Sequence, residues 1–167
     1  MVSAKDPLPA GAESRLQSLG IELPAPPTPF GVYVEALQTG NLLFLSGMLP
    51  VIDHKPKYVG RVGKELDAEA ARDAARTAVL SGLAAARQHL GSLDRISRVI
   101  RLGVYIATFG DFLDLPKVAD GASELLGEIF GRDKPPVRSV LGVASLPLGV
   151  PIELELTFEV AEELRRE

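Results

Sequence analysis

The chain has 167 residues, of which 46% are hydrophobic and 24% are charged, and its net charge at pH 7 is -4. This length and composition are typical of one globular domain with a hydrophobic core. The acidic balance argues against a dedicated nucleic-acid binder, which usually carries a basic surplus. Because the chain has no cysteine, disulfides, thiolate nucleophiles and cysteine-ligated zinc are excluded. The two histidines, His54 and His89, are too far apart in the sequence for the usual zinc-hydrolase motif.

The sequence contains no stretch that is typical of a membrane span or a secretory signal. A spanning helix needs roughly 20 mostly apolar residues. The uncharged stretches 36–52 and 139–152 are both interrupted by glycine and proline. The N-terminus lacks the apolar segment of a signal peptide. We therefore expect a cytoplasmic protein without a membrane partner.

Residues 1–28 are expected to form an N-terminal leader, and residues 29–167 the main domain. Residues 1–11 are rich in proline, glycine and alanine and predict a loose segment. A short amphipathic helix is predicted over residues 12–19. Residues 23–31 contain four prolines and predict an extended strap, which lies over a surface because proline cannot join a central strand ladder.

Hydrophobic patterns in the main domain predict the element order β-β-(β)-α-β-α-β-β. The strongest pattern is a helix over residues 68–90, which Asp67 is placed to cap and Gly91 to end. A hairpin is predicted within residues 32–47, with its turn at Thr39-Gly40-Asn41. The other predicted elements, in chain order, are a short edge strand at 58–62, a strand at 96–108, a helix at 115–130, and strands at 138–144 and 152–160.

The number of helices limits how the predicted sheet is covered. Two helices cannot cover both faces of a sheet of five or six strands, so we expect both on one face of an α+β domain. Residues 42–45 are nevertheless apolar in succession, and a strand alternates its side chains between the two faces. The second face therefore also needs cover, and we expect another subunit to supply it.

Arg138 is the most conspicuous polar residue inside the hydrophobic pattern, because it heads an otherwise uncharged strand. A guanidinium beside a dry surface is costly unless it is paired. One interpretation is that it captures a ligand carboxylate with its two-pronged fork. The alternatives are a structural ion pair with Glu153 or Glu155, or a solvated strand end, and spacing alone favours these. No glycine-rich phosphate loop or cluster with metal-ligand spacing accompanies it.

Two segments resemble the motifs of a known family. Residues 137–161 read VRSVLGVASLPLGVPIELELTFEVA, which is similar to the pattern R-S-x-x-x-V-A-x-L-P-x-x-x-x-[IV]-E-[IV]-E. Residues 31–50 read GVYVEALQTGNLLFLSGMLP, which is similar to a motif that begins G-P-Y and ends S-G-Q-[IL]-P. Both motifs belong to the Rid family of reactive-intermediate (enamine/imine) deaminases, also called L-PSP endoribonuclease-like proteins. The resemblance spans about residues 29–160.

The resemblance implies a chorismate-mutase-like domain that assembles as a homotrimer, with ligand sites in clefts between subunits. In such deaminases the arginine that matches Arg138 holds the carboxylate of a 2-imino acid. The glutamate that matches Glu153 activates or positions the attacking water, and the residues that match Tyr33 and Gly47 line the pocket. The products are a 2-keto acid and ammonia, with no cofactor or metal. The implied partners are a small carboxylate metabolite and further copies of the chain.

A simple hairpin of the last two strands would place Arg138 opposite about residue 158, five residues from Glu153. That offset is on the order of 16 Å at about 3.3 Å for each residue. For the two side chains to meet, either the strands pair differently or the glutamate comes from a neighbouring subunit, and we expect the neighbouring subunit.

The chain departs from the family pattern at several positions: Val32, Met48, Val140, Gly142, and Pro116, the residue nearest to where a pocket asparagine often lies. The alternative function is therefore a non-catalytic trimer that binds a small metabolite at the same cleft. A third function, endoribonuclease, is disfavoured by the net negative charge and the lack of a basic patch with interleaved aromatic residues.

Overall fold

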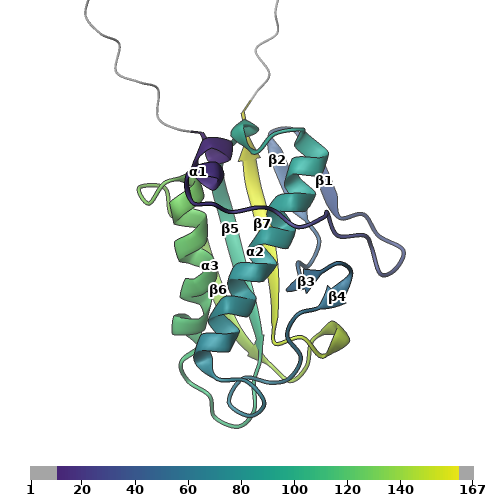
Figure 1. Cartoon of the computed structure of the whole chain (residues 1–167), viewed down its shortest axis with the longest axis vertical. Helices are drawn as coiled ribbons and strands as arrows, with labels where there is room; N and C mark the ends of the chain where they lie inside the picture. The colour runs from purple at the N-terminus through teal and green to yellow at the C-terminus, as the bar shows by residue number, and fades with distance from the viewer. Residues whose placement is uncertain (1–10, 162–167) are drawn as a thin grey trace, which may run out of the picture.

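The computed structural model describes residues 11–161, which fold into an α+β domain with helices on one face of a five-stranded sheet (Figure 1). The predicted loose segment lies, apart from Gly11, outside the described residues, as do residues 162–167. The helices are α1 (Ala12–Ser18), α2 (Ala68–Leu90) and α3 (Leu115–Phe130), with short 3-10 helices η1 (Leu93–Arg95) and η2 (Pro147–Gly149). The strands are β1 (Ala36–Thr39), β2 (Leu42–Leu45), β3 (Val51–Ile52), β4 (Lys55–Pro56), β5 (Ile96–Ala107), β6 (Val137–Val143) and β7 (Ile152–Val160).

The sheet has the strand order β1-β2-β7-β5-β6, and β3 pairs separately with β4. Strands β5 and β6 run parallel because α3 connects them as a crossover. Strand β7 lies between β2 and β5 and is antiparallel to both. The simple hairpin considered for the last two strands is therefore wrong. The crossover places β6 on one side of β5, and residues 144–151 carry the chain past the end of β5 to its other side.

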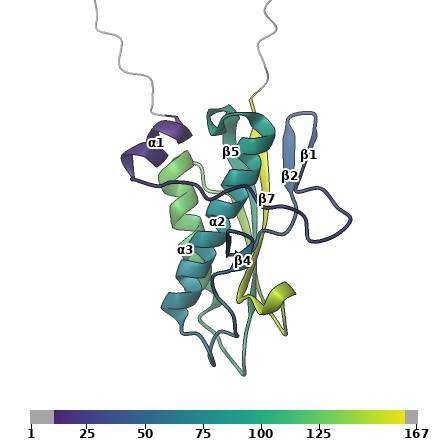
Figure 2. The same ribbon diagram turned by 45° about the vertical axis from the view of Figure 1, so that its right-hand side comes forward.

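The two long helices lie where the sequence pattern predicts them, and both pack on the same face of the sheet (Figure 2). At the start of α2, the Asp67 side chain accepts a hydrogen bond from the backbone N–H of Ala70, at 2.8 Å. At its end, Gly91 has φ of 84°, a left-handed conformation that favours glycine. The buried face of α2 is rich in alanine, which lets the helix lie close to the sheet.

The segment before β1 is attached to the domain. The predicted helix over residues 12–19 is confirmed as α1, and its Leu16 is buried. Glu13 accepts hydrogen bonds from Arg87 at 3.0 and 2.6 Å and from the backbone N–H of Leu93 at 2.9 Å. The predicted strap then runs extended past α2 towards β1 (Figure 1). Near its end, Thr28 lies 3.3 Å from the His54 ring.

The hairpin predicted within residues 32–47 is confirmed: β1 and β2 pair around a turn at Gly40-Asn41, and Tyr33 lies in the loop before β1. The short edge strand predicted at 58–62 is wrong. Residues 58–62 form no strand; Val62 makes isolated bridges to Leu66 and Thr108 instead. Here the apolar alternation reflects burial against neighbouring segments and not a continuous ladder, which a local pattern cannot distinguish.

The face of the sheet opposite the helices is open in the single chain. One row across it runs, strand by strand, through Leu37, Phe44, Thr157, Arg101 and Val137. The three apolar side chains in this row are 56%, 41% and 69% exposed, respectively. An apolar row of this kind is typical of a surface that another protein covers. No helix within residues 11–161 is long and apolar enough to span a membrane.

The close approach of α2 and α3 can be tested at Gly121. A methyl group on Gly121 would lie 2.4 Å from the backbone oxygen of Arg72, and backbone atoms cannot move aside cheaply. We expect Gly121→Ala to lower the free energy of unfolding by about 1–3 kcal/mol, measured by urea denaturation. Gly127→Ala on the same helix is the control, because the nearest atom there belongs to the Arg132 side chain, at 3.5 Å. An equal effect of the two changes would contradict this packing.

Candidate functional site: two separated cavities

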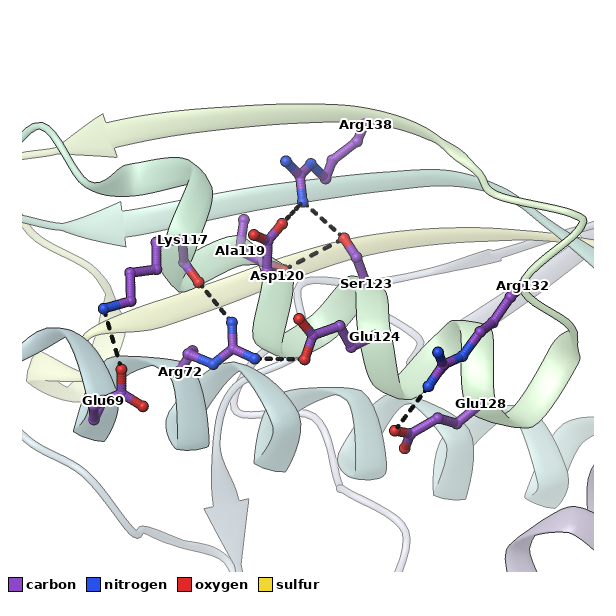
Figure 3. A network of polar contacts seen from close by, with 10 residues as sticks. All are labelled: Glu69, Arg72, Lys117, Ala119, Asp120, Ser123, Glu124, Glu128, Arg132 and Arg138. Atoms are coloured by element: carbon purple, nitrogen blue, oxygen red, sulfur yellow. Dashed lines mark hydrogen bonds and ion pairs between the residues drawn. The ribbon is translucent and has the colours of Figure 1, made fainter.

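Arg138 lies on the edge strand β6 and reaches α3. Its Nη1 donates hydrogen bonds to Asp120 Oδ1 at 2.7 Å and to Ser123 Oγ at 2.9 Å (Figure 3). Its side chain is 28% exposed. The structural ion pair considered from the sequence therefore exists, but its acid is on α3, whereas Glu153 and Glu155 were the acids expected. Among the described residues, neither of those glutamates contacts Arg138.

A cavity of about 600 Å³ opens beside the Arg138 guanidinium. It lies between the second half of α3 and the segment that leads into β6. Its lining includes Arg138, Ser123, Glu128, Arg132 and Lys134. Because Arg138 Nη2 and Nε make no hydrogen bond with a described residue, one edge of the guanidinium stays available beside this cavity. Such an edge matches the geometry of a carboxylate.

Ion pairs fix α3, and with it the partners of Arg138. Arg72 of α2 pairs with Glu124 and also donates a hydrogen bond to the backbone oxygen of Lys117, at 3.0 Å (Figure 3). The side chain of Lys117 in turn pairs with Glu69, at 3.4 Å. These contacts hold the two helices in one register. The positions of the Asp120 and Ser123 side chains therefore depend on the α2–α3 contact.

A second cavity, of about 400 Å³, gathers the other three predicted site residues, which are Tyr33, Gly47 and Glu153. A Cβ atom on Gly47 would lie 1.8 Å from Glu153 Oε1, so only glycine lets the carboxylate occupy this place. The Tyr33 hydroxyl accepts a hydrogen bond from the backbone N–H of Phe30, at 2.9 Å, which holds the loop around the cavity. The remaining wall comes from two segments that lie far apart in the sequence: Phe30, Gly31, Ser46, Leu49, Pro147 and Leu148.

Glu153 is electrostatically unusual. Burial raises the pKa of its carboxyl group, and the nearby charge of Glu155 raises the pKa further. Glu155 itself accepts a hydrogen bond from the Tyr105 hydroxyl at 2.9 Å, and Arg101 lies 3.9 Å away. The Glu155 carboxylate therefore has stabilising polar partners, whereas the Glu153 carboxylate is disfavoured by burial and by the charge of Glu155. A carboxyl group of this kind can both take up and release a proton closer to neutral pH than an exposed glutamate.

Arg138 and Glu153 cannot meet within one chain. Arg138 pairs in register with Leu102, which is fully buried beneath the helices. Glu153 pairs with Tyr105, three residues further along β5 and therefore on the opposite face. The strand pairing does differ from a simple hairpin, but this difference does not bring the two groups together. The sheet itself separates them.

Asp120 and Ser123 are the site residues that sequence reasoning missed. They are three residues apart, so they lie on the same side of α3 and can share one guanidinium. The sequence feature that could have indicated these two residues is the polar edge of an otherwise apolar helix. The pattern alone does not show which strand that edge faces. Pro116, noted as the nearest match to a pocket asparagine, begins α3 one turn earlier. Within residues 11–161, no three acidic or histidine side chains gather as a metal site would require.

The mixed sheet with two long helices on one face defines a chorismate-mutase-like protein, and comparisons with known proteins agree with this class. The YjgF/chorismate mutase-like family, which carries a provisional endoribonuclease assignment, matches residues 13–161. The chain belongs to this family, which is the YjgF/Rid family. The family resemblance inferred from the two motifs is thus confirmed.

Three relatives show how far the similarity extends. Protein TCP17 of Trypanosoma cruzi is 35% identical over 88% of this chain and 92% of its own length. A 2-iminobutanoate/2-iminopropanoate deaminase of Dermatophagoides farinae is 30% identical over 81% of this chain and 91% of its own. A solved structure from Shewanella oneidensis, provisionally named an endoribonuclease, superimposes with a TM-score of 0.86. It is 32% identical and covers 90% of this chain and 100% of its own.

The raised pKa of Glu153 predicts a pH-dependent effect on stability. A carboxyl group whose folded-state pKa lies above its unfolded value destabilises the fold once it is ionised. We expect Glu153→Gln to raise the free energy of unfolding at pH 7. The gain should disappear as the pH falls through the folded-state pKa and then below the unfolded one, where both states of the wild type are protonated.

Urea denaturation across this pH range measures the effect. Glu159→Gln is the control, because it removes the same charge from the same face of β7 but does not line the cavity that contains Glu153. A gain of the same size at acidic and neutral pH would contradict the assignment.

Proposed function

We propose that the protein hydrolyses 2-imino acids, or their enamine tautomers, to 2-keto acids and ammonia, at sites formed between copies of the chain. The observation that carries the proposal is that the chain has two cavities, each with only part of the groups that the reaction needs. One has a guanidinium with a free edge, and the other has a carboxyl group with a raised pKa. The deaminase name of the Dermatophagoides farinae relative supports this reaction class.

The chemistry assigns a separate task to each group. The free edge of Arg138 holds the substrate carboxylate and so fixes the position of the neighbouring imine carbon. Glu153 takes a proton from a water molecule as its oxygen bonds to that carbon, and passes a proton to the nitrogen. The remaining hydroxyl proton then passes through Glu153 to the nitrogen as the carbon–nitrogen bond breaks, so the carbonyl of the 2-keto acid forms and ammonia leaves. Tyr33 and Gly47 shape the cavity around the Glu153 carboxyl group. The reaction needs water but no cofactor.

Assembly of several chains is part of the proposal. Because Arg138 and Glu153 lie on opposite faces of one sheet, a complete site needs the cavity of a second copy. The exposed row of Leu37, Phe44 and Val137 offers an apolar surface for that contact. We propose a closed homotrimer, in which each Arg138 faces the Glu153 of a neighbour.

The reaction is tested by supplying an imine made in situ by an amino-acid oxidase. Keto-acid release is followed while semicarbazide traps the remaining imine. We expect Arg138→Ala to lower kcat/KM by about 100-fold, because two charge-assisted hydrogen bonds to the carboxylate are lost. Arg132→Ala is the control, because Arg132 lines the same cavity but is 80% exposed and pairs with Glu128. Equal rates for the wild type and Arg138→Ala would contradict the proposal.

Binding measurements separate catalysis from metabolite binding alone. If a 2-keto acid raises Tm in the wild type but not in Arg138→Ala, and neither variant accelerates hydrolysis, the protein binds the metabolite without turning it over. That result would replace the deaminase proposal with the non-catalytic alternative.

Subunit mixing tests where the glutamate comes from. Arg138→Ala and Glu153→Gln chains are each expected to retain little activity alone. If the sites lie between subunits, a refolded equal mixture should regain about one quarter of the wild-type activity, because most random trimers then hold one intact site. If both groups acted within one chain, the mixture would stay inactive, and that outcome would contradict an intersubunit site.

A further inference from the structure

Leu148 has a backbone conformation that its side chain disfavours. It lies in η2 with φ of 58° and ψ of 11°, a left-handed conformation in which a Cβ atom crowds the following carbonyl oxygen. The turn around it is closed by hydrogen bonds from the N–H groups of Gly149 and Val150, both at 3.2 Å. Glycine would adopt this conformation without strain. A leucine that is held here indicates that its side chain has a task at this place.

Packing in the hydrophobic core does not explain the Leu148 side chain. Within residues 11–161, neither Leu148 nor Phe30 at the end of the strap packs against either cluster of buried side chains. Both instead line the cavity around Glu153, and they are 48% and 55% exposed, respectively. Two large apolar side chains, from segments far apart in the sequence, therefore leave apolar surface open beside the Glu153 carboxyl group. Such surface is typical of a place that a ligand or another protein covers.

The rest of the cavity wall limits which part of a substrate can enter it. Among the described residues, no arginine, lysine or histidine lines this cavity, and the Glu153 carboxylate repels another anion. The Ser46 hydroxyl already donates a hydrogen bond to the backbone oxygen of Val34, at 2.6 Å. The Tyr33 hydroxyl already accepts one from the backbone N–H of Phe30. An acidic group therefore has no partner in this cavity, whereas an apolar group has two exposed apolar side chains to contact.

We propose that Leu148 and Phe30 determine substrate specificity: they contact the substituent on the reacting carbon, so the protein prefers 2-imino acids with large apolar substituents over those with small or acidic ones. The inference rests on the proposed function, which places the reacting carbon beside Glu153 and the carboxylate on the Arg138 of a second copy. The substituent is bonded to that carbon, so it lies in the same cavity as the Glu153 carboxyl group. A large apolar substituent removes the exposed surface of both side chains from water and is bound more tightly for that reason.

The test measures keto-acid release from imines that amino-acid oxidases make in situ from L-leucine, L-2-aminobutanoate and L-glutamate. Each variant is compared with the wild type on the same imine. Leu148→Gly removes the side chain and keeps the left-handed backbone. It should lower kcat/KM about tenfold for the imine of leucine and by no more than about twofold for that of 2-aminobutanoate. The imine of glutamate should be the poorest wild-type substrate of the three, and a glutamate imine hydrolysed as fast as that of leucine would contradict the proposal.

Urea denaturation and two further variants separate specificity from a structural role. Leu148→Gly relieves backbone strain and removes no core contact, so the denaturation midpoint should not fall. Phe30→Ala keeps the backbone N–H that donates to Tyr33 and should lower the same ratio of rates. Leu113→Ala is the control, because Leu113 is 82% exposed and lines neither cavity, and it should leave the ratio unchanged. If Leu148→Gly is poorly folded, an unchanged ratio in Phe30→Ala would still overturn the proposal.

Binding of two 2-keto acids, measured by isothermal titration calorimetry, distinguishes the inference from the function on which it rests. The wild type should bind 4-methyl-2-oxopentanoate more tightly than 2-oxobutanoate, and Leu148→Gly should remove most of this difference. If it does so but the wild type hydrolyses no imine, the two side chains select the ligand and the proposed reaction fails. If Leu148→Gly slows hydrolysis of every imine by the same factor, the inference fails while the reaction stands. If it instead separates the assembled chains in sedimentation and affects all ligands equally, the two side chains contact a second copy, and the inference is overturned.

Discussion

The alternation of side chains across a strand determines where chemistry can occur in this protein. Leu102, Leu154 and Leu156 are buried beneath the helices, and their burial fixes which residues of β5 and β7 face the open side. Through the register of β5, Arg138 falls on the covered side and Glu153 on the open side. A shift of register by one residue would move the buried leucines of β5 and β7 out of the core and into solvent. The hydrophobic core therefore keeps Arg138 and Glu153 on opposite faces of the sheet.

The α2–α3 contact supports one half of the site. Arg72 on α2 pairs with Glu124 and caps a backbone oxygen of α3, while Gly121 lets the helix backbones approach closely. The guanidinium of Arg138 is thus oriented by a helix that is itself held by a second helix. The other half of the site, around Glu153, is built largely from loops. Tyr33 lies in the loop before β1, and residues of η2 form another part of the cavity wall. The half that is supported by helices holds the proposed carboxylate anchor, and the half that is built from loops holds the proposed proton-transfer group.

Sequence reasoning found the elements that are governed by local physics. The bounds of α2, α3 and β7 agree with the predicted ranges 68–90, 115–130 and 152–160, because periodicity and caps operate within one segment. It failed where the outcome depends on distant segments. The neighbour of β6 and the absence of a strand at 58–62 are examples.

The candidate site was likewise predicted only in part from the sequence. The motif resemblance placed Tyr33, Gly47 and Glu153 together, and the structure gathers them in one cavity. The acid beside Arg138 could not be named from the sequence, because Asp120 belongs to no motif and which side of α3 meets β6 is set by packing between segments far apart in the chain. Spacing pointed to Glu153 or Glu155, and the strand crossover removed both from reach.

The close contact between Gly47 and Glu153 makes the residue allowed at position 47 depend on the residue at position 153. Any side chain at 47 would collide with the carboxylate in its present place, so a change at 47 requires the Glu153 side chain to move or to be lost first. Lineages that lose the long acid are free to gain a larger residue at 47, and those that keep the acid are not. Among descendants of this chain, a residue larger than glycine at 47 therefore indicates that the acid at 153 has been lost or has moved.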